Sequence, residues 1–139
     1  MKRFDGKVVV ITGGGSGMGK ISCTLFAQEG ASVCVVDINE KTAKATADEI
    51  IAAGGKAKAY AIDITNEAPV EALFDDAVAT FGRLDVYFTI AGISPVGTAV
   101  TTSYEDYKKV VALDMDSVFL GSKYCIPHMI KTGGGVILN

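Results

Sequence analysis

Residues 8–22, VVVITGGGSGMGKIS, join a short apolar run to a cluster of glycines. The β-branched run that ends at Thr12 is typical of a buried parallel strand, and the apolar spacing from Met18 to Gln28 predicts a helix. A tight glycine turn between a strand and a helix lets main-chain N–H groups approach a phosphate, and the helix N-terminus adds the positive end of its dipole. The stretch therefore predicts a phosphate-binding turn.

Two common phosphate-binding patterns fail in this turn. Gly14-x-x-x-x-Gly19-Lys20 resembles the loop of nucleoside triphosphatases, which needs Ser or Thr directly after the lysine to ligate magnesium. Ile21 stands there and has no oxygen, while Ser22 lies about 100° further around the helix. The pattern G-x-G-x-x-G fails as well, because none of its possible registers has a glycine at the sixth position. An ordinary tight strand–helix turn is the structural alternative.

Strands and helices are predicted to alternate along the rest of the chain. Strands are expected over 32–37, 56–63, 85–90 and 134–139, and helices over 40–53 (capped by Asn39), 65–81 and 104–130, with Pro127 kinking or fraying the last turn. This order predicts an α/β fold, a Rossmann-type doubly wound parallel sheet that is truncated after about its fifth strand. We expect residues 1–139 to form one dinucleotide-binding domain, with a C-terminal catalytic portion missing.

Composition excludes several classes of partner. The formal net charge is −3 with no basic stripe, so we expect no nucleic-acid partner. No stretch approaches the ~18 apolar residues of a membrane span, so we expect a cytoplasmic protein that does not bind membranes. Three cysteines without C-x-x-C spacing are expected to be small buried hydrophobes. His128 is the single histidine, which argues against a histidine metal site and predicts a capping or surface role.

The pattern Thr12-Gly13-x-x-x-Gly17-x-Gly19 fits the turn without exception, and here the sequence resembles the classical short-chain dehydrogenase/reductase family. Further similar segments are VVDIN, AIDIT, FGRLDV followed by AG, and YKKVVALDMDSVFLGSKYCIPHMIKTGGGVI, so the resemblance covers effectively the whole chain. It implies an NAD site made by residues of the glycine turn and of the loops that follow the next three strands. These residues are Gly13, Ser16, Gly17, Met18 and Gly19, then Asp37 and Ile38, then Asp63 and Ile64, and then Ile90, Ala91 and Gly92.

Asp37 decides between the two nicotinamide dinucleotides. A carboxylate at the end of the second strand accepts the ribose hydroxyls of NAD, which contributes about 1.5–3 kcal/mol. It repels the 2′-phosphate of NADP by about 4 kcal/mol per charge pair at 4 Å in an effective dielectric of 20. No Arg or Lys stands at Gly14, Gly15 or Ile38 to offset that repulsion. The alternatives are helix capping by Asp37 and, for Asp63, an Asx-type turn.

The resemblance implies hydride transfer between a nicotinamide and a small-molecule alcohol or carbonyl. The family's serine and its Y-x-x-x-K pair would lie beyond Asn139, and Tyr104-x-x-x-Lys108 comes too early in the chain, so we expect a surface pair there. Asp114 stands at the family's proton-relay asparagine and is the one candidate catalytic residue. Ile90 stands where the family has the asparagine of its NAG motif.

Two hypotheses follow from the sequence. The first is the cofactor-binding portion of an NAD-dependent oxidoreductase, which binds NADH weakly and turns over no alcohol by itself. The second is a non-catalytic dinucleotide-binding or interaction module. If the first hypothesis holds, we expect an unprotected fifth strand and homo-oligomerisation through an apolar face of the long helix, whereas a natural short module should carry terminal charges or prolines that protect this edge. That face is predicted to comprise Val110, Val111, Leu113, Val118 and Phe119.

Overall fold

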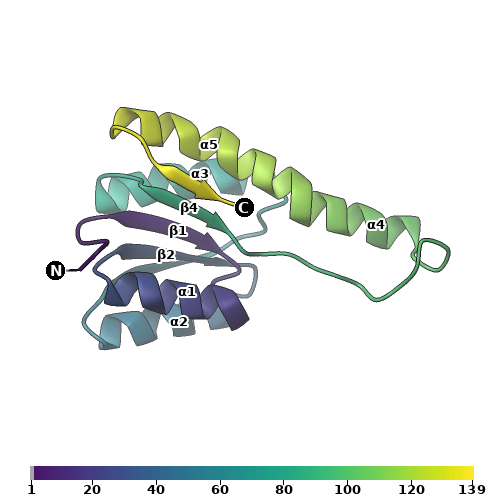
Figure 1. Cartoon of the computed structure of the whole chain (residues 1–139), viewed down its shortest axis with the longest axis horizontal. Coiled ribbons are helices and arrows are strands. Elements are labelled where there is room, and N and C mark those ends of the chain that lie inside the picture. The colour runs from purple at the N-terminus through teal and green to yellow at the C-terminus, as the bar shows by residue number, and fades with distance from the viewer. Residues whose placement is uncertain (1) are drawn as a thin grey trace.

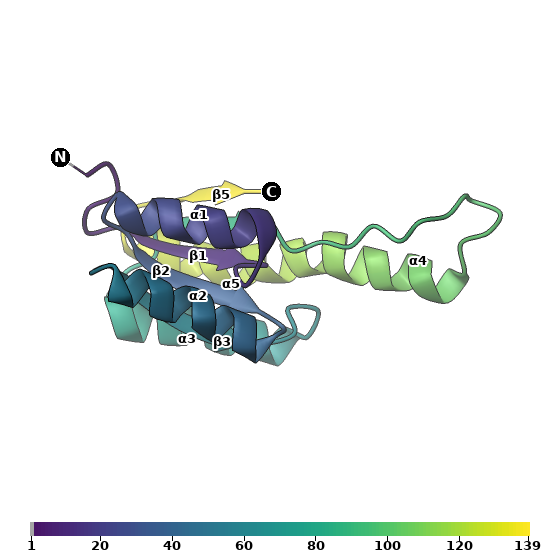
Figure 2. The same cartoon turned by 90° about the horizontal axis from the view of Figure 1, so that it is seen from below.

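A computed structural model describes residues 2–139 as a parallel sheet covered by helices on both faces (Figures 1 and 2). The strand order is β3-β2-β1-β4-β5. The strands are β1 (Val8–Thr12), β2 (Ser32–Asp37), β3 (Lys56–Ala61), β4 (Val86–Thr89) and β5 (Val136–Leu138). All four neighbouring pairs are parallel, which confirms the predicted doubly wound α/β architecture.

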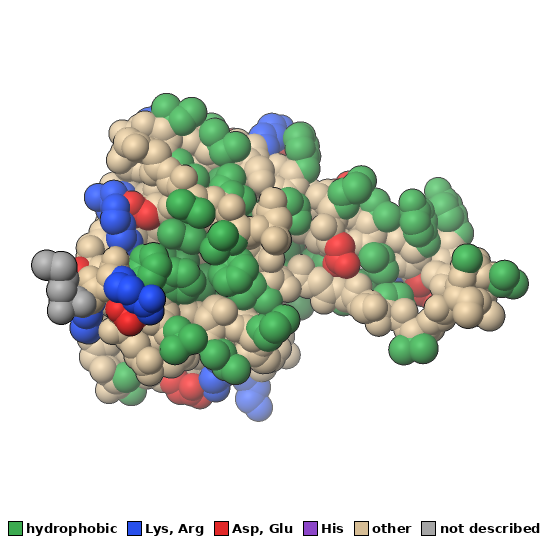
Figure 3. Space-filling model, in the orientation of Figure 1, with side chains coloured by type: hydrophobic (Ala, Val, Ile, Leu, Met, Phe, Trp, Pro, Cys, Tyr) green, Lys and Arg blue, Asp and Glu red, His purple; other side chains and the backbone are tan. Residues whose placement is uncertain are grey.

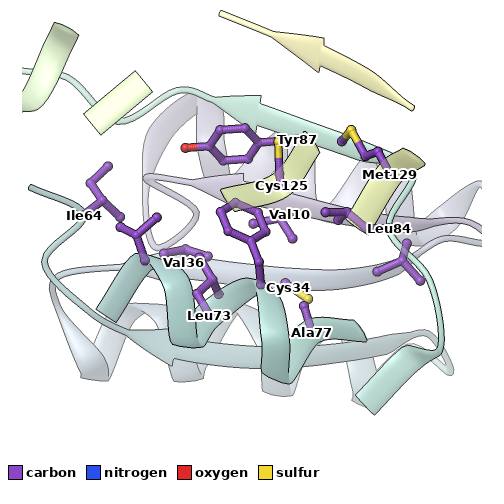
Figure 4. Close-up of a cluster of buried hydrophobic side chains, with 13 residues drawn as sticks. Val10, Cys34, Val36, Ile64, Leu73, Ala77, Leu84, Tyr87, Cys125 and Met129 are labelled. Carbon is purple, nitrogen blue, oxygen red and sulfur yellow. The ribbon is translucent and has the colours of Figure 1, made fainter. Parts of the chain in front are cut away.

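Helices α1 (Gly17–Gln28) and α2 (Glu40–Ala52) cover one face of the sheet, and α3 (Glu67–Phe81) and α5 (Ser117–Lys131) cover the other. The strand period of two separates the core into two layers accordingly. On the α3 side, Val10, Cys34 and Tyr87 lie in register on neighbouring strands and pack with residues of both helices (Figure 4). All three cysteines are buried and free, as the sequence predicts.

The segment between β3 and α3 is longer than predicted. The strand ends at Ala61 rather than Asp63, and the helix begins at Glu67 with Asn66 at its N-cap. The side chain of Asp63 explains the difference, because it accepts hydrogen bonds from the N–H and the hydroxyl of Thr65. Such a bond holds the backbone in a turn and so delays the helix.

The long helix predicted for residues 104–130 is present but is not uniform. It consists of α4 (Tyr104–Val111), a π-helical turn η1 (Ala112–Asp116) and α5. Pro127 lies inside α5, which continues to Lys131, so the helix does not fray at this proline, while the predicted kink stays a prediction. The chain between β4 and α4 extends away from the sheet and carries α4 with it (Figures 1 and 2). Within residues 2–139, no helix has the length and apolar character needed to cross a membrane.

Candidate cofactor site

The carboxyl ends of the strands border a cleft of about 490 Å³. In a doubly wound sheet a ligand binds in the crevice at these ends, where the direction of the strand order reverses. Here β1 has β2 on one side and β4 on the other, so that point lies at the end of β1. Most of the residues predicted to bind the cofactor line this cleft. It is lined by Gly13, Ser16, Val36, Asp37, Ile38, Ile62, Asp63, Ile64, Thr65, Ala91, Gly92, Ile93, Lys109, Ala112 and Leu113.

The glycine turn brings the end of β1 close to the start of α1. A side chain on Gly19 would place its Cβ 2.6 Å from the carbonyl carbon of Gly13, and nearer still to the Gly13 oxygen. Gly13 has a φ of 68°, and a Cβ there would lie 3.1 Å from Cα of Ala91. Glycine is therefore needed at both positions, because backbone rather than a flexible side chain occupies the space.

Helix α1 begins directly after this turn, with Ser16 at its N-cap. The first N–H groups of a helix have no partner within the helix, so those of Gly17, Met18 and Gly19 are free to donate to an anion. The side chain of Met18 is 75% exposed, so the residue can contribute to this anion site through its backbone N–H. Gly13 and Ser16 line the cleft, whereas these three residues do not.

Asp37 lies at the mouth of the turn. One carboxylate oxygen accepts the N–H of Gly15 at 2.9 Å, and the other accepts the N–H of Asn39 at 3.0 Å. The helix cap of α2 is Asn39, whose side chain accepts the N–H of Thr42, so the capping alternative for Asp37 is wrong. Two amides fix the Asp37 carboxylate, and each oxygen keeps a further lone pair for a ligand hydroxyl.

Asp63 serves two purposes. One of its oxygens makes the Asx-type turn with Thr65 at 2.9 and 2.7 Å, as the structural alternative predicted. The residue also lines the cleft beside Ile64. A carboxylate can accept about four hydrogen bonds, so the turn leaves acceptor capacity for a ligand.

Thr12 joins the ends of β1 and β4. Its hydroxyl oxygen accepts the N–H of Ile90 at 3.1 Å and that of Ala91 at 3.2 Å. The side chain of Ile90 packs with the core layer under α1 and α2, and so it does not line the cleft as Ala91 and Gly92 do. Thr12 thus ties the central strands at the position where Ile90 offers no side-chain hydrogen bond.

Asp114 lies in the π-helical turn and faces the loop after β4. Its carboxylate accepts the N–H of Ile93 at 3.1 Å, and a Cβ on Gly92 would lie 3.2 Å from the same oxygen. The hydroxyl of Ser117 donates to the carbonyl of Leu113 at 2.5 Å, while the Ser117 N–H bonds Ala112 as the π geometry requires. The π turn therefore holds Asp114 against the backbone that forms one end of the cleft.

Residues 7–139 match the family model described as short chain dehydrogenase. The chain belongs to the short-chain dehydrogenase/reductase family.

Relatives within this family are oxidoreductases. The chain is 45% identical over 136 residues to an uncharacterized oxidoreductase of Thermotoga maritima, covering 98% of this chain and 53% of the relative. It is 40% identical to the cyclohexanol dehydrogenase of an Acinetobacter species (strain SE19), covering 99% and 55%. A solved 7α-hydroxysteroid dehydrogenase, in complex with NADH and 7-oxo glycochenodeoxycholic acid, superposes with a TM-score of 0.92 at 40% identity, covering 97% and 52%. The chain thus spans about half the length of these proteins.

The residues present fit a nicotinamide dinucleotide. A diphosphate needs a turn that it can approach closely, which Gly13 and Gly19 provide, and a helix N-terminus, which α1 provides. A ribose needs a fixed acceptor, which Asp37 provides. The apolar lining residues, such as Val36, Ile62 and Ile64, suit the flat faces of a base.

Tyr104 and Lys108 form a surface pair, as predicted. The Lys108 ammonium lies 5.1 Å from the ring centroid of Tyr104, which is 73% exposed and stacks on Tyr107. Neither residue lines the cleft. His128 differs from its predicted surface or capping role, because its mostly buried ring lies 3.1 Å from a carboxylate oxygen of Asp75 and so joins α5 to α3. The described residues contain no cluster of metal-ligating side chains.

Sequence reasoning missed the wall of the cleft that α4 and η1 supply. Lys109, Ala112 and Leu113 line it. Their spacing of three and four residues places them on one helical face, which was the available signal. The prediction that Leu113 belongs to an exposed dimerisation face conflicted with this pattern. In the structure Leu113 packs against the core layer on the α3 side.

Proposed function

We propose that this chain is the cofactor-binding portion of an NAD-dependent oxidoreductase that transfers hydride between a nicotinamide and an alcohol or carbonyl compound. The observation that carries the proposal is the Asp37 carboxylate, held at the mouth of the glycine turn by the N–H groups of Gly15 and Asn39. Residues 1–139 would act as a dinucleotide-binding domain. The bound cofactor would supply the hydride chemistry, and this chain's residues bind and orient it.

The choice of NAD over NADP rests on charge. Asp37 and the exposed Ile38 line the mouth of the cleft, and neither could neutralise a 2′-phosphate. The N–H of Gly15 already donates to Asp37, so this amide is not free for a phosphate oxygen. The similar hydroxysteroid dehydrogenase, which was solved in complex with NADH, supports the same choice.

Proton transfer is the step for which this chain supplies the fewest suitable side chains. Tyr104 and Lys108 lie on the surface outside the cleft, and Asp114 uses a carboxylate oxygen to hold the N–H of Ile93. We therefore propose that the chain alone binds the cofactor without turning over substrate. The names of related dehydrogenases, such as the cyclohexanol enzyme, suggest a small alcohol as the substrate of the whole protein.

Titration with NADH and NADPH tests the cofactor assignment. The chain has no tryptophan, so the fluorescence of the reduced nicotinamide can be followed directly. We expect NADH to bind more tightly than NADPH, and Asp37→Ser to weaken NADH at least about tenfold, since it removes a charge-assisted acceptor. Asp48→Ser, which removes an exposed carboxylate paired with Lys44, is the matched control and should change neither affinity. Tighter binding of NADPH by the unmodified chain would refute the assignment.

A panel of secondary alcohols tests whether the chain is catalytic by itself. We expect no reduction of NAD by the purified chain with cyclohexanol or similar alcohols. Steady NAD reduction would show that proton transfer needs nothing beyond these residues. Binding of NADH without turnover agrees equally with the second hypothesis, a non-catalytic dinucleotide-binding module. The two would then be separated by turnover in a protein that contains both this chain and the counterpart of its relatives' second half.

We also propose that the chain self-associates through the long helix. Exposed apolar side chains recur on it at spacings of four and seven residues, and hydrophobic side chains also line the projecting segment that carries α4 (Figure 3). The exposed residues of this helix stripe are Met115, Phe119, Ile126 and Ile130. Of the five residues predicted for that face, Phe119 alone is exposed, and the other four are partly buried.

A reducing compartment such as the cytoplasm suits the three free thiols.

A further inference from the structure

We propose that Lys109 determines cofactor affinity by placing a positive charge in the wall of the cleft, where it attracts the anionic dinucleotide. This inference rests on the proposed function, because it concerns the same site. It assigns a role to a residue that lies outside the glycine turn and outside the loops that follow the strands.

The position of Lys109 is the first observation. Lys109, Ala112 and Leu113 form the α4 and η1 wall of the cleft, whose lining also includes Gly92 and Ile93. Among the described residues that line the cleft, Lys109 carries the only positive charge. Its remaining charged side chains are the carboxylates of Asp37 and Asp63. Without Lys109 the lining side chains would therefore oppose an anionic ligand with two negative charges and no positive one.

The second observation is how the Lys109 ammonium is held. It lies 2.8 Å from a carboxylate oxygen of Glu105 and 3.4 Å from one of Asp106, both one turn earlier in α4. The hydrogen bond that the ammonium donates to Glu105, and then the one that it donates to Asp106, raises the pKa of Lys109, so the group stays charged at neutral pH. Half of the Lys109 side chain is exposed, so the ammonium can leave these partners for another anion.

The two carboxylates differ in how firmly they are placed. Asp106 belongs to the cap of α4, because its second oxygen accepts the Ser103 hydroxyl and its N–H donates to the same hydroxyl. Glu105 is 76% exposed and pairs with Lys109. Glu105 is therefore the partner that competes with a bound anion for the Lys109 ammonium, and its removal should strengthen binding.

The neighbouring Lys108 provides a matched control. It carries the same charge on the same helix but points to the ring of Tyr104, 5.1 Å from the ammonium, and does not line the cleft. If net charge alone mattered, Lys108 and Lys109 would contribute equally. If position in the cleft matters, Lys109 alone should affect affinity.

The experiment measures NADH binding to the whole chain by nicotinamide fluorescence. The variants are Lys109→Met, Lys109→Arg, Lys108→Met and Glu105→Gln, each checked for native circular dichroism. Titrations are made at about 10 mM and about 1 M salt, where the Debye length is about 30 Å and about 3 Å. Adenosine, which has no charge, is titrated by calorimetry as the neutral comparator.

We expect Lys109→Met to raise the NADH dissociation constant about threefold to tenfold at low salt, the effect of one partly screened charge pair. Lys108→Met and Lys109→Arg should stay near the unmodified value, and Glu105→Gln should bind NADH more tightly. At high salt the effect of Lys109→Met should shrink toward one, and adenosine binding should not change at either salt concentration.

Equal affinities for Lys109→Met and Lys108→Met would overturn the inference while leaving the proposed function intact. So would an effect of Lys109→Met that persists at high salt or extends to adenosine, because packing rather than charge would then be responsible. If the unmodified chain binds neither NADH nor adenosine, the proposed function fails, and this inference fails with it.

Discussion

Substituting Gly19 by alanine adds one methyl group at the point where the glycine turn meets α1. The new Cβ would lie 2.6 Å from the carbonyl carbon of Gly13 and 3.1 Å from the N of Gly14, and it would be closer still to the Gly13 oxygen. These are backbone atoms of the turn, so no side chain can rotate away to make room. The turn and the start of α1 must move apart.

The cost can be worked from two opposing effects. Overpacking of this kind costs typically about 1–3 kcal/mol, and the close backbone contact places Gly19→Ala at the upper end of that range. Alanine in a helix is about 1 kcal/mol more favourable than glycine, which offsets part of the cost. The free energy of unfolding should therefore fall by about 2 kcal/mol, which lowers Tm by roughly 6–10 °C in a chain of this size.

Binding should suffer as well as stability, because the displaced N–H groups are those that would donate to the diphosphate. We expect Gly19→Ala to raise the NADH dissociation constant more than about tenfold, equivalent to about 1.4 kcal/mol. Thermal unfolding by circular dichroism and NADH fluorescence measure the two effects. Ser22→Ala, one turn further along α1, is the control. The reasoning is refuted if Gly19→Ala binds NADH like the control and unfolds at the same temperature.

Three further predictions follow from other contacts. Asp85 has a pKa below its ordinary value: burial alone would raise the pKa, but hydrogen bonds from Arg83, the Val8 N–H and Lys7 outweigh it. Its contribution to stability should therefore be present above its unfolded pKa of about 3.9 and be lost as pH falls through the lower folded value. In urea unfolding, Asp85→Asn should lower the free energy of unfolding by about 2 kcal/mol at neutral pH and make it depend less on pH in the acid range. If the acid dependence stays unchanged, a group other than Asp85 is responsible for it. Phe119→Glu should remove about 2 kcal/mol of apolar burial from each copy, which weakens a twofold dimer about a thousandfold in sedimentation velocity. The exposed loop variant Val100→Glu should not alter association, and a dimer that survives Phe119→Glu unchanged would exclude the helix stripe. Asp114→Ala should speed hydrogen exchange of the Ile93 amide, while Asp114→Asn, which keeps an acceptor oxygen, should not; equal protection in both would contradict the role of that hydrogen bond.

The features that were predictable from sequence depend on local patterns. The β-branched run of β1 and the glycines after it specify a strand, a turn and a helix within about twenty residues, and the structure contains all three. Asp37 was predictable for the same reason, because it ends the strand that pairs next to β1. Because parallel strands end at one edge of a sheet, the strand ends alone predict that these residues, although distant in sequence, lie close together.

The features that were not predictable depend on contacts between distant segments. The end of β3 shifted because a side-chain hydrogen bond from Asp63 replaced two residues of strand with a turn. Pro127 did not fray the last turn of α5, since the helix packs on α3 through its neighbours Cys125 and Met129, which lie in the core. In both cases a tertiary or side-chain contact outweighed the local preference of the backbone.

The π turn shows most clearly why the α4 wall escaped sequence reasoning. An extra residue in a helical turn rotates every later position by about 100° relative to an uninterrupted helix. A face drawn on a regular helix therefore cannot stay correct on both sides of Ala112–Asp116. Before the turn Lys109 lines the cleft, and after it Phe119 and Ile126 are exposed. The same irregularity that misplaced the predicted dimerisation face thus allows one helix to line the cleft at one end and to carry an exposed apolar stripe at the other.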